Sequence, residues 1–149
     1  PATPTDLVTL QGSASKTIRL VRVRVTGNQT TAGINIFFLI KRSSADSGGT
    51  FAADTIIPHD STDPAATATF GHYTANPTAG TPVDNVRVQR LLCAAPAGTT
   101  NDIISWEFEG QLDRPITLRG TAEQIALNFN GAALPAGMSL SVYFEWTEE

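Results

Sequence analysis

The strongest constraint on this chain is a two-residue alternation of apolar and polar side chains that recurs along most of its length. In the last third, Ile104, Trp106 and Phe108 alternate with polar residues, and segments 125–129 and 138–146 repeat the pattern. Such alternation is typical of β-strands with one buried face. Clusters of glycine, proline and small polar residues separate the segments about every 8–12 residues, which is the spacing of a sandwich or barrel. The pattern therefore predicts an all-β, antiparallel β-sandwich.

Composition agrees with a single domain of this kind. The chain of 149 residues contains two lysines and six glutamates but twenty threonines, so strong helix formers are scarce and residues that favour pleated surfaces are common. A chain of this length can bury a core that needs no disulfide or metal. We predict one β-sandwich domain over residues 15–149. A jelly roll is the favoured form, ahead of an immunoglobulin-like sandwich or an up-and-down barrel.

Residues 1–14 contain two prolines and no clear periodicity, and we predict that they form an extended N-terminal arm. An ordinary edge strand with a loose end would fit this pattern, and so would an arm that lies on a neighbouring subunit. The first residues lack the basic and apolar regions of a secretory signal. The longest apolar run, residues 34–40, is far shorter than a membrane helix, so we expect no membrane partner.

A strand over residues 16–26 changes phase in its middle. Ile18 and Leu20 share one face of an ideal strand, whereas the three valines that follow have the opposite parity. One face can bury both sets only if an extra residue is inserted, which predicts a β-bulge near residues 20 and 21. Arg22 and Arg24 then project outward. They either engage an acidic partner surface or simply protect a strand face from aggregation.

A strand over residues 33–42 is apolar on both faces, which is typical of a strand that is covered twice or that contributes to an interface. We expect its inward face to consist of Ile34, Ile36, Phe38 and Ile40. Phe37 and Leu39 then point outward and need other cover, from a loop or the arm of the same chain or from a symmetric neighbour. The candidate interface residues are therefore Phe37, Leu39, Arg22 and Arg24.

Few residues could support catalysis or bind a metal. His59, Asp60 and Asp63 form a short cluster, but the spacing suits an exposed turn better than a metal site, and His72 would have to come from another strand. Glu107 and Glu109 share a strand face that we expect to be solvated. No nucleophile elbow or phosphate-binding loop is present. We therefore predict no enzymatic activity, no cofactor and no metal.

Two further counts exclude other classes of protein. The net charge of -4 and the pI of about 5.1 argue against a nucleic-acid partner. A single cysteine, Cys93, excludes an intrachain disulfide and a zinc site built from several cysteines.

Several stretches resemble small proteins from the structural gene blocks of tailed bacteriophages. They are residues 47–61, 64–66 and 73–78, together with the strand at 16–27 and the closing Glu145-Trp146-Thr147-Glu148. The resemblance lies in the overall sequence pattern of most of the chain and not in a catalytic motif. It implies a virion component with a jelly-roll sandwich, of the capsid decoration or cement type, and it transfers no active site.

The function expected from the resemblance is structural. The protein would bind the outer capsid shell, with the major capsid protein as its partner, and stabilise adjacent capsid subunits as a homo-oligomer, a dimer or a trimer. It would be made in the host cytoplasm and reside on the capsid surface. The alternative is a tail-fibre or receptor-binding jelly-roll module that recognises a host glycan.

Overall fold

The computed structural model describes residues 5–95, 102–108, 114–129 and 134–149. The regular structure of these residues consists of β-strands: β1 (Asp6–Gln11), β2 (Thr17–Asn28), β3 (Gly33–Arg42), β4 (Thr50–Ala53), β5 (Thr69–Ala75), β6 (Pro82–Cys93), β7 (Ile103–Glu107), β8 (Ile116–Arg119), β9 (Gln124–Asn128) and β10 (Ser139–Glu148).

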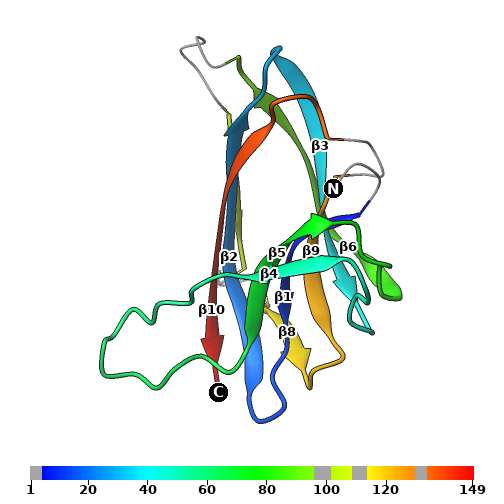
Figure 1. The fold of residues 1–149 in the computed structure, drawn as a ribbon. Coiled ribbons are helices and arrows are strands. Elements are labelled where there is room, and N and C mark those ends of the chain that lie inside the picture. Colours follow the sequence, from blue (N-terminus) through cyan, green and yellow to red (C-terminus); the bar gives the residue numbers. More distant parts are fainter. Residues whose placement is uncertain (1–4, 96–101, 109–113, 130–133) are drawn as a thin grey trace.

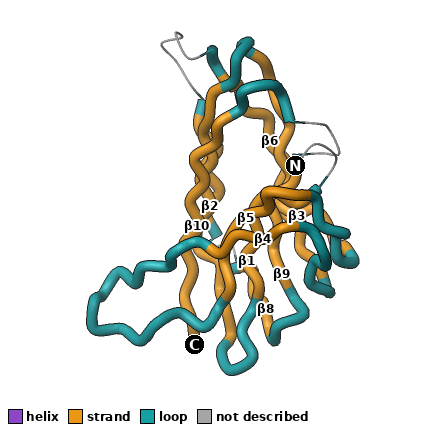
Figure 2. The backbone as a smooth tube through the Cα atoms, viewed as in Figure 1, coloured by secondary structure: helices purple, strands orange, loops and turns teal. Residues whose placement is uncertain are grey.

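The strands form two antiparallel sheets packed as a sandwich (Figures 1 and 2). One sheet has six strands in the order β4-β5-β1-β9-β3-β6. In the four-stranded sheet, β2 lies between β10 and β7 and also pairs with β8. The prediction of an all-β antiparallel sandwich is therefore confirmed. The jelly roll, which is a particular way of connecting such sheets, remains a prediction.

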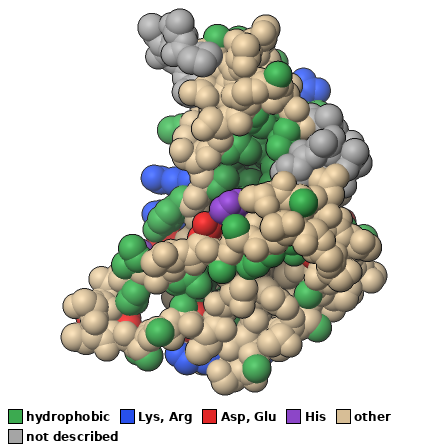
Figure 3. Space-filling model, viewed as in Figure 1, with side chains coloured by type: hydrophobic (Ala, Val, Ile, Leu, Met, Phe, Trp, Pro, Cys, Tyr) green, Lys and Arg blue, Asp and Glu red, His purple; other side chains and the backbone are tan. Residues whose placement is uncertain are grey.

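The hydrophobic core lies between the two sheets, where Figure 3 shows apolar side chains gathered. The late strands contribute the residues that alternation predicts: Trp106, Phe108, Leu127, Phe129 and Phe144 are buried. Val142 and Trp146 are partly buried against the same cluster. Each fully buried large apolar side chain stabilises the fold by roughly 1.5–3 kcal/mol, so this cluster holds the two sheets together.

β2 contains the predicted bulge. Its register against β10 pairs Arg22 with Glu145 and Leu20 with Trp146, so Val21 is the extra residue. β2 also changes its other neighbour at this point, from β8 to β7. As a result both phases of the strand reach the core: the buried residues are Ile18, Leu20, Val21, Val23 and Val25.

β3 turns the opposite face to the core from the one predicted. Phe37 and Leu39 are fully buried, whereas Ile34 is 64% exposed. The outward orientation of Phe37 and Leu39 is therefore wrong, and so is their assignment to an interface. The Phe37 ring packs edge to face against Phe129, with 5.1 Å between ring centroids.

The reversal is possible because two polar residues on the buried face of β3 have partners elsewhere in the fold. Asn35 donates a hydrogen bond to the Gln29 side chain at 3.0 Å. The Lys41 ammonium donates to the carbonyl of Thr117 at 2.8 Å. Burial of a polar group is tolerated when it is hydrogen-bonded, so the face that contains Asn35 and Lys41 can be the inner one.

The predicted N-terminal arm is wrong for the residues that the structure describes. Residues 6–11 form β1, which is a central strand between β5 and β9. Leu10 is fully buried, and Leu7 and Val8 are nearly so. Residues 1–4 lie outside the described part of the chain.

Candidate interaction surface

Of the two arginines predicted to point outward, Arg22 is neutralised within its own sheet. Its Nε lies 2.8 Å from Oε2 of Glu107, and its Nη1 lies 3.3 Å from Oε2 of Glu145. The hydrogen bond from Arg22 holds the pKa of Glu107 below its usual value. Glu107 therefore pairs with a cation on an exposed strand face, and Glu109 lies outside the described residues. With two carboxylates already beside it, Arg22 has little charge to offer a partner.

Arg24, two residues further along β2, has different neighbours. Its register places it between Ser105 of β7 and Tyr143 of β10. Within the described residues, no carboxylate oxygen lies within ion-pair distance of its guanidinium. Arg24 is thus the exposed cation of the predicted pair that remains able to bind an anionic group.

The outer face of β3 and β6 carries a contiguous apolar surface, which we call the β3–β6 strip. Register places Ile34 opposite Leu92 and Phe38 opposite Val88. Ile34, Val88 and Leu92 are 64%, 52% and 40% exposed, and Ile36 and Phe38 are half-buried. Single exposed apolar residues are ordinary, but contiguous apolar patches commonly mark interaction sites, so the strip is a candidate interaction surface.

One cation interrupts the β3–β6 strip. Arg90 lies opposite Ile36, between the two apolar cross-strand pairs, and is exposed. Arg87, on the other face of β6, places its guanidinium 5.1 Å from the centroid of the Phe108 ring. Arg87 and Arg90 therefore point to opposite faces of β6. Arg90 instead gives the strip a charge that any covering surface must neutralise.

A shallow trough of about 360 Å³ lies on the outer face of the other sheet, across β7, β2 and β10. Arg24 and Thr26 line its middle, with Ser105 and Ser141 on either side. Ile103 and Tyr143 are its two large apolar walls, at 63% and 44% exposure. The trough combines an aromatic ring, an aliphatic side chain and a guanidinium, residue types that are common at the centres of protein interfaces.

A larger groove of about 430 Å³ separates β10 from the loop over residues 54–68. Glu148 attaches one end of this loop to β10, because its carboxylate accepts hydrogen bonds from the backbone N–H groups of Thr67 and Ala68. Burial opposes its ionisation, but these bonds and the one from the Thr67 hydroxyl lower the pKa of Glu148 overall. The charged residues of the groove are thus partly committed to holding the loop.

The two histidines do not form a metal or catalytic site with each other. His72 pairs with Asp54 at 3.0 Å, and His59 lies 3.9 Å from Glu145. Across the described residues, no group of three His, Cys, Asp or Glu side chains is arranged to hold a metal ion. Asp60 accepts hydrogen bonds from the backbone and hydroxyl of Thr62, which is the turn chemistry that its sequence context predicts.

Cys93 is a buried free thiol. Burial raises its pKa, although a hydrogen bond with Asn35 opposes this effect. A thiol with a raised pKa is a poor nucleophile, so Cys93 acts as a core side chain.

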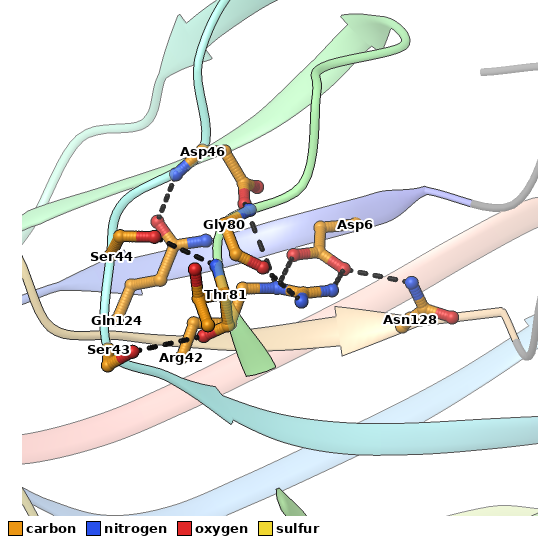
Figure 4. A network of polar contacts seen from close by, with 9 residues as sticks. All are labelled: Asp6, Arg42, Ser43, Ser44, Asp46, Gly80, Thr81, Gln124 and Asn128. Carbon is orange, nitrogen blue, oxygen red and sulfur yellow. Dashed lines mark hydrogen bonds and ion pairs between the residues drawn. The ribbon is translucent and has the colours of Figure 1, made fainter. Parts of the chain in front are cut away.

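A buried polar network attaches two loops to the outer face of the six-stranded sheet (Figure 4). Arg42 forms a two-pronged ion pair with Asp6 and donates to the carbonyl of Gly80 at 2.7 Å. The backbone N–H of Gly80 donates to Oδ1 of Asp46 at 2.8 Å, and Asp46 N–H donates to Gln124 at 3.1 Å. The network thereby joins the loops over residues 43–49 and 76–81 to β1, β3 and β9.

The charges of this network do not balance if both acids are ionised. The side chains of Asp6 and Asp46 are fully buried, and Arg42 is the cation beside them. Burial, together with the neighbouring Asp6 charge, raises the pKa of Asp46 to about 6. The network therefore holds the two loops against the sheet, and its Asp46 carboxyl is protonated in mildly acidic solution.

Comparison with protein-family models, with curated proteins and with solved structures finds no match to this chain. The described residues contain no helix long and apolar enough to cross a bilayer. The sequence correctly predicted that Arg24 points outward, but it predicted the wrong face of β3 to lie at the surface. It also missed the polar network, because neither Asp46 nor Gln124 belongs to a recognisable motif.

Proposed function

We propose that the protein is a virion structural protein of the capsid decoration type, with a jelly-roll sandwich. It binds the major capsid protein on the outer shell as a homo-oligomer and stabilises adjacent subunits without catalysis, after synthesis in the host cytoplasm. The β3–β6 strip carries this proposal, because it is an apolar face of a well-packed sandwich that a single chain leaves exposed. The resemblance of the sequence to bacteriophage structural proteins supports it.

The shape of the strip favours contact through its face rather than through strand pairing at the β6 edge. β6 begins at Pro82 and has two bulges against β3, where Val86 and Val83 are the extra residues. Proline and bulges hinder the addition of another strand to a sheet edge. The side chains of the strip remain available, so a partner packs against them from outside the sheet.

Arg90 defines the chemistry of that partner surface. A guanidinium buried among Ile36, Val88 and Leu92 without a counter-charge would cost several kcal/mol. Two copies packed through the same strip would bring like charges together, which is unfavourable. The strip therefore suits a different surface that is apolar and presents a carboxylate opposite Arg90, which we assign to the capsid shell.

The test is co-sedimentation of the purified protein with virus particles that lack it. Wild type should bind saturably, and Val88→Asp or Arg90→Glu should weaken binding by about tenfold or more, since each removes a contact worth at least ~1.4 kcal/mol. Arg119→Glu is the matched control, because Arg119 is an exposed arginine at the end of β8.

Absence of wild-type binding would overturn the capsid function itself. Binding of wild type and of both strip variants with equal affinity would retain the function and remove the strip from it.

A second candidate is a receptor-binding module that recognises host glycan. The trough favours it, because the exposed ring of Tyr143 lies beside the hydroxyls of Ser105 and Ser141 and the guanidinium of Arg24. A flat apolar ring with polar groups around it is a suitable platform for a sugar. Saturable glycan binding that is lost in Tyr143→Ala would support this candidate.

A further inference from the structure

The loop over residues 54–68 stands away from the body of the sandwich (Figures 1 and 3). It connects β4 to β5 through 15 residues without a strand, and loops of this length in a small domain are usually functional. Ile57 is 78% exposed, the highest value among the large hydrophobic residues of the described chain. Asp60 and Asp63 are also exposed. The loop therefore exposes an aliphatic side chain and two carboxylates to solvent, and Ile57 and Asp63 also line the open groove against β10.

The trough lies further along β10, beside Tyr143 on its outer face, and presents the complementary chemistry. Its guanidinium, Arg24, has no carboxylate within ion-pair distance among the described residues, and its walls are Ile103 and Tyr143. None of the residues that line the trough belongs to the loop of the same chain. The trough is thus open to a segment from another molecule that carries both an acid and an apolar side chain.

We propose that the loop of one copy docks in the trough of the next, with its carboxylates against Arg24 and Ile57 between Ile103 and Tyr143. The contact is head to tail, since loop and trough are different surfaces, and such contacts close into rings when the rotation allows. The contact gives the protein a route to self-association that does not use the β3–β6 strip. It does not depend on the capsid function, because it needs only copies of this chain.

The experiment compares the association of the isolated protein and its variants by sedimentation velocity. Wild type should be oligomeric at micromolar concentration, and Arg24→Glu should be monomeric. The loop variant Asp60→Asn with Asp63→Arg should also be monomeric, since asparagine can still accept the hydrogen bonds of the turn. Combining the trough and loop changes in one chain should restore the oligomer, because the carboxylate introduced in the trough would then face the guanidinium introduced in the loop.

Two further variants separate loss of contact from loss of fold. Ile57→Ser changes a side chain that is 78% exposed and should weaken association by about tenfold or more, as removal of an interface aliphatic does. Arg119→Glu makes the same charge change as Arg24→Glu and should remain oligomeric.

The proposal is overturned if wild type is monomeric, or if Arg24→Glu associates as wild type does. If Arg24→Glu is monomeric but the combined variant is not rescued, the loop is not the occupant. If a glycan fills the trough, neither the charge changes nor Ile57→Ser alters the oligomeric state.

Discussion

At the scale of single residues, Asp46 couples the fold to pH. Its side chain is fully buried beside Asp6, and one guanidinium, from Arg42, lies beside the two acids. Within the described chain, Oδ2 of Asp46 has no hydrogen-bond partner. Burial of the carboxyl, together with the neighbouring Asp6 charge, favours its protonated form and raises the pKa of Asp46 from 3.8 to about 6.

The consequence is a loss of stability as the pH rises. Because the folded-state pKa of Asp46 lies above its unfolded value, the folded protein binds this proton more tightly. The Asp46 contribution is fully present below the unfolded pKa of 3.8 and is lost as the pH passes about 6. We expect Asp46 to lower the free energy of unfolding by about 2–3 kcal/mol between acid and neutral pH.

Asp46→Asn should remove this dependence, since the amide keeps the acceptor for Gly80 and has no charge to bury. Urea unfolding at several pH values should show that the variant is the more stable protein at neutral pH. The matched control, Asp84→Asn, replaces an exposed acid of β6 and should follow wild type. Equal pH dependence in wild type and Asp46→Asn would contradict the assignment of the proton.

At the scale of strands, the orientation of β3 has a direct test in two neighbouring residues. Phe37→Ala removes a fully buried ring and should lower the free energy of unfolding by about 3–5 kcal/mol. Phe38→Ala removes a half-buried ring on the outer face and should cost about 1–2 kcal/mol in the isolated chain. Chemical denaturation measures both, and a larger loss for Phe38→Ala would mean that the strand faces the other way.

The bulge in β2 makes a second prediction at this scale. Deleting Val21 would remove the extra residue, so the side chains on one side of the deletion would reverse faces. Val23 and Val25 could no longer be buried together with Ile18, and we expect the variant to lack a cooperative unfolding transition. Deleting Thr55, in the exposed loop after β4, should leave the melting temperature close to that of wild type.

These strands show how far sequence reasoning reaches. The bulge could be predicted because Ile18, Leu20 and the later valines conflict in parity, and a local conflict has a local solution. The buried face of β3 could not be predicted. Both faces are apolar, and which of them is buried depends on partners such as Gln29 and Thr117. Those partners are distant in the sequence or lie on other elements.

The candidate interaction surfaces could be predicted only in part. The alternation in β2 correctly predicted that Arg24 points outward. Its lack of a counter-ion could not be predicted, because that depends on which strands flank β2. The β3–β6 strip follows from the corrected face of β3 and from its pairing with β6. Pairing between strands distant in sequence was the missing information in both cases.

At the scale of the whole molecule, the β3–β6 strip and the trough lie on the outer faces of different sheets. In the proposed function, one surface contacts the shell while the other joins copies to one another. Linked copies bind a repetitive shell more tightly than single ones, because each later contact is made at high effective concentration.

This arrangement predicts that self-association controls shell binding. Arg24→Glu, which leaves the β3–β6 strip unchanged, should lower the apparent affinity for particles by about a hundredfold through loss of avidity. Co-sedimentation over a range of protein concentrations measures the effect, and Arg119→Glu should bind as wild type does. If Arg24→Glu forms monomers that bind with unchanged affinity, the two surfaces act independently.

The central claim, that the β3–β6 strip seats this protein on a capsid, is tested most directly by electron cryomicroscopy of virus particles that carry it. The account predicts density for the two-sheet sandwich on the outer shell, with Val88 and Leu92 against the major capsid protein and a carboxylate beside Arg90. Density for the sandwich on the tail, or on the shell with the β3–β6 strip facing solvent, would contradict it.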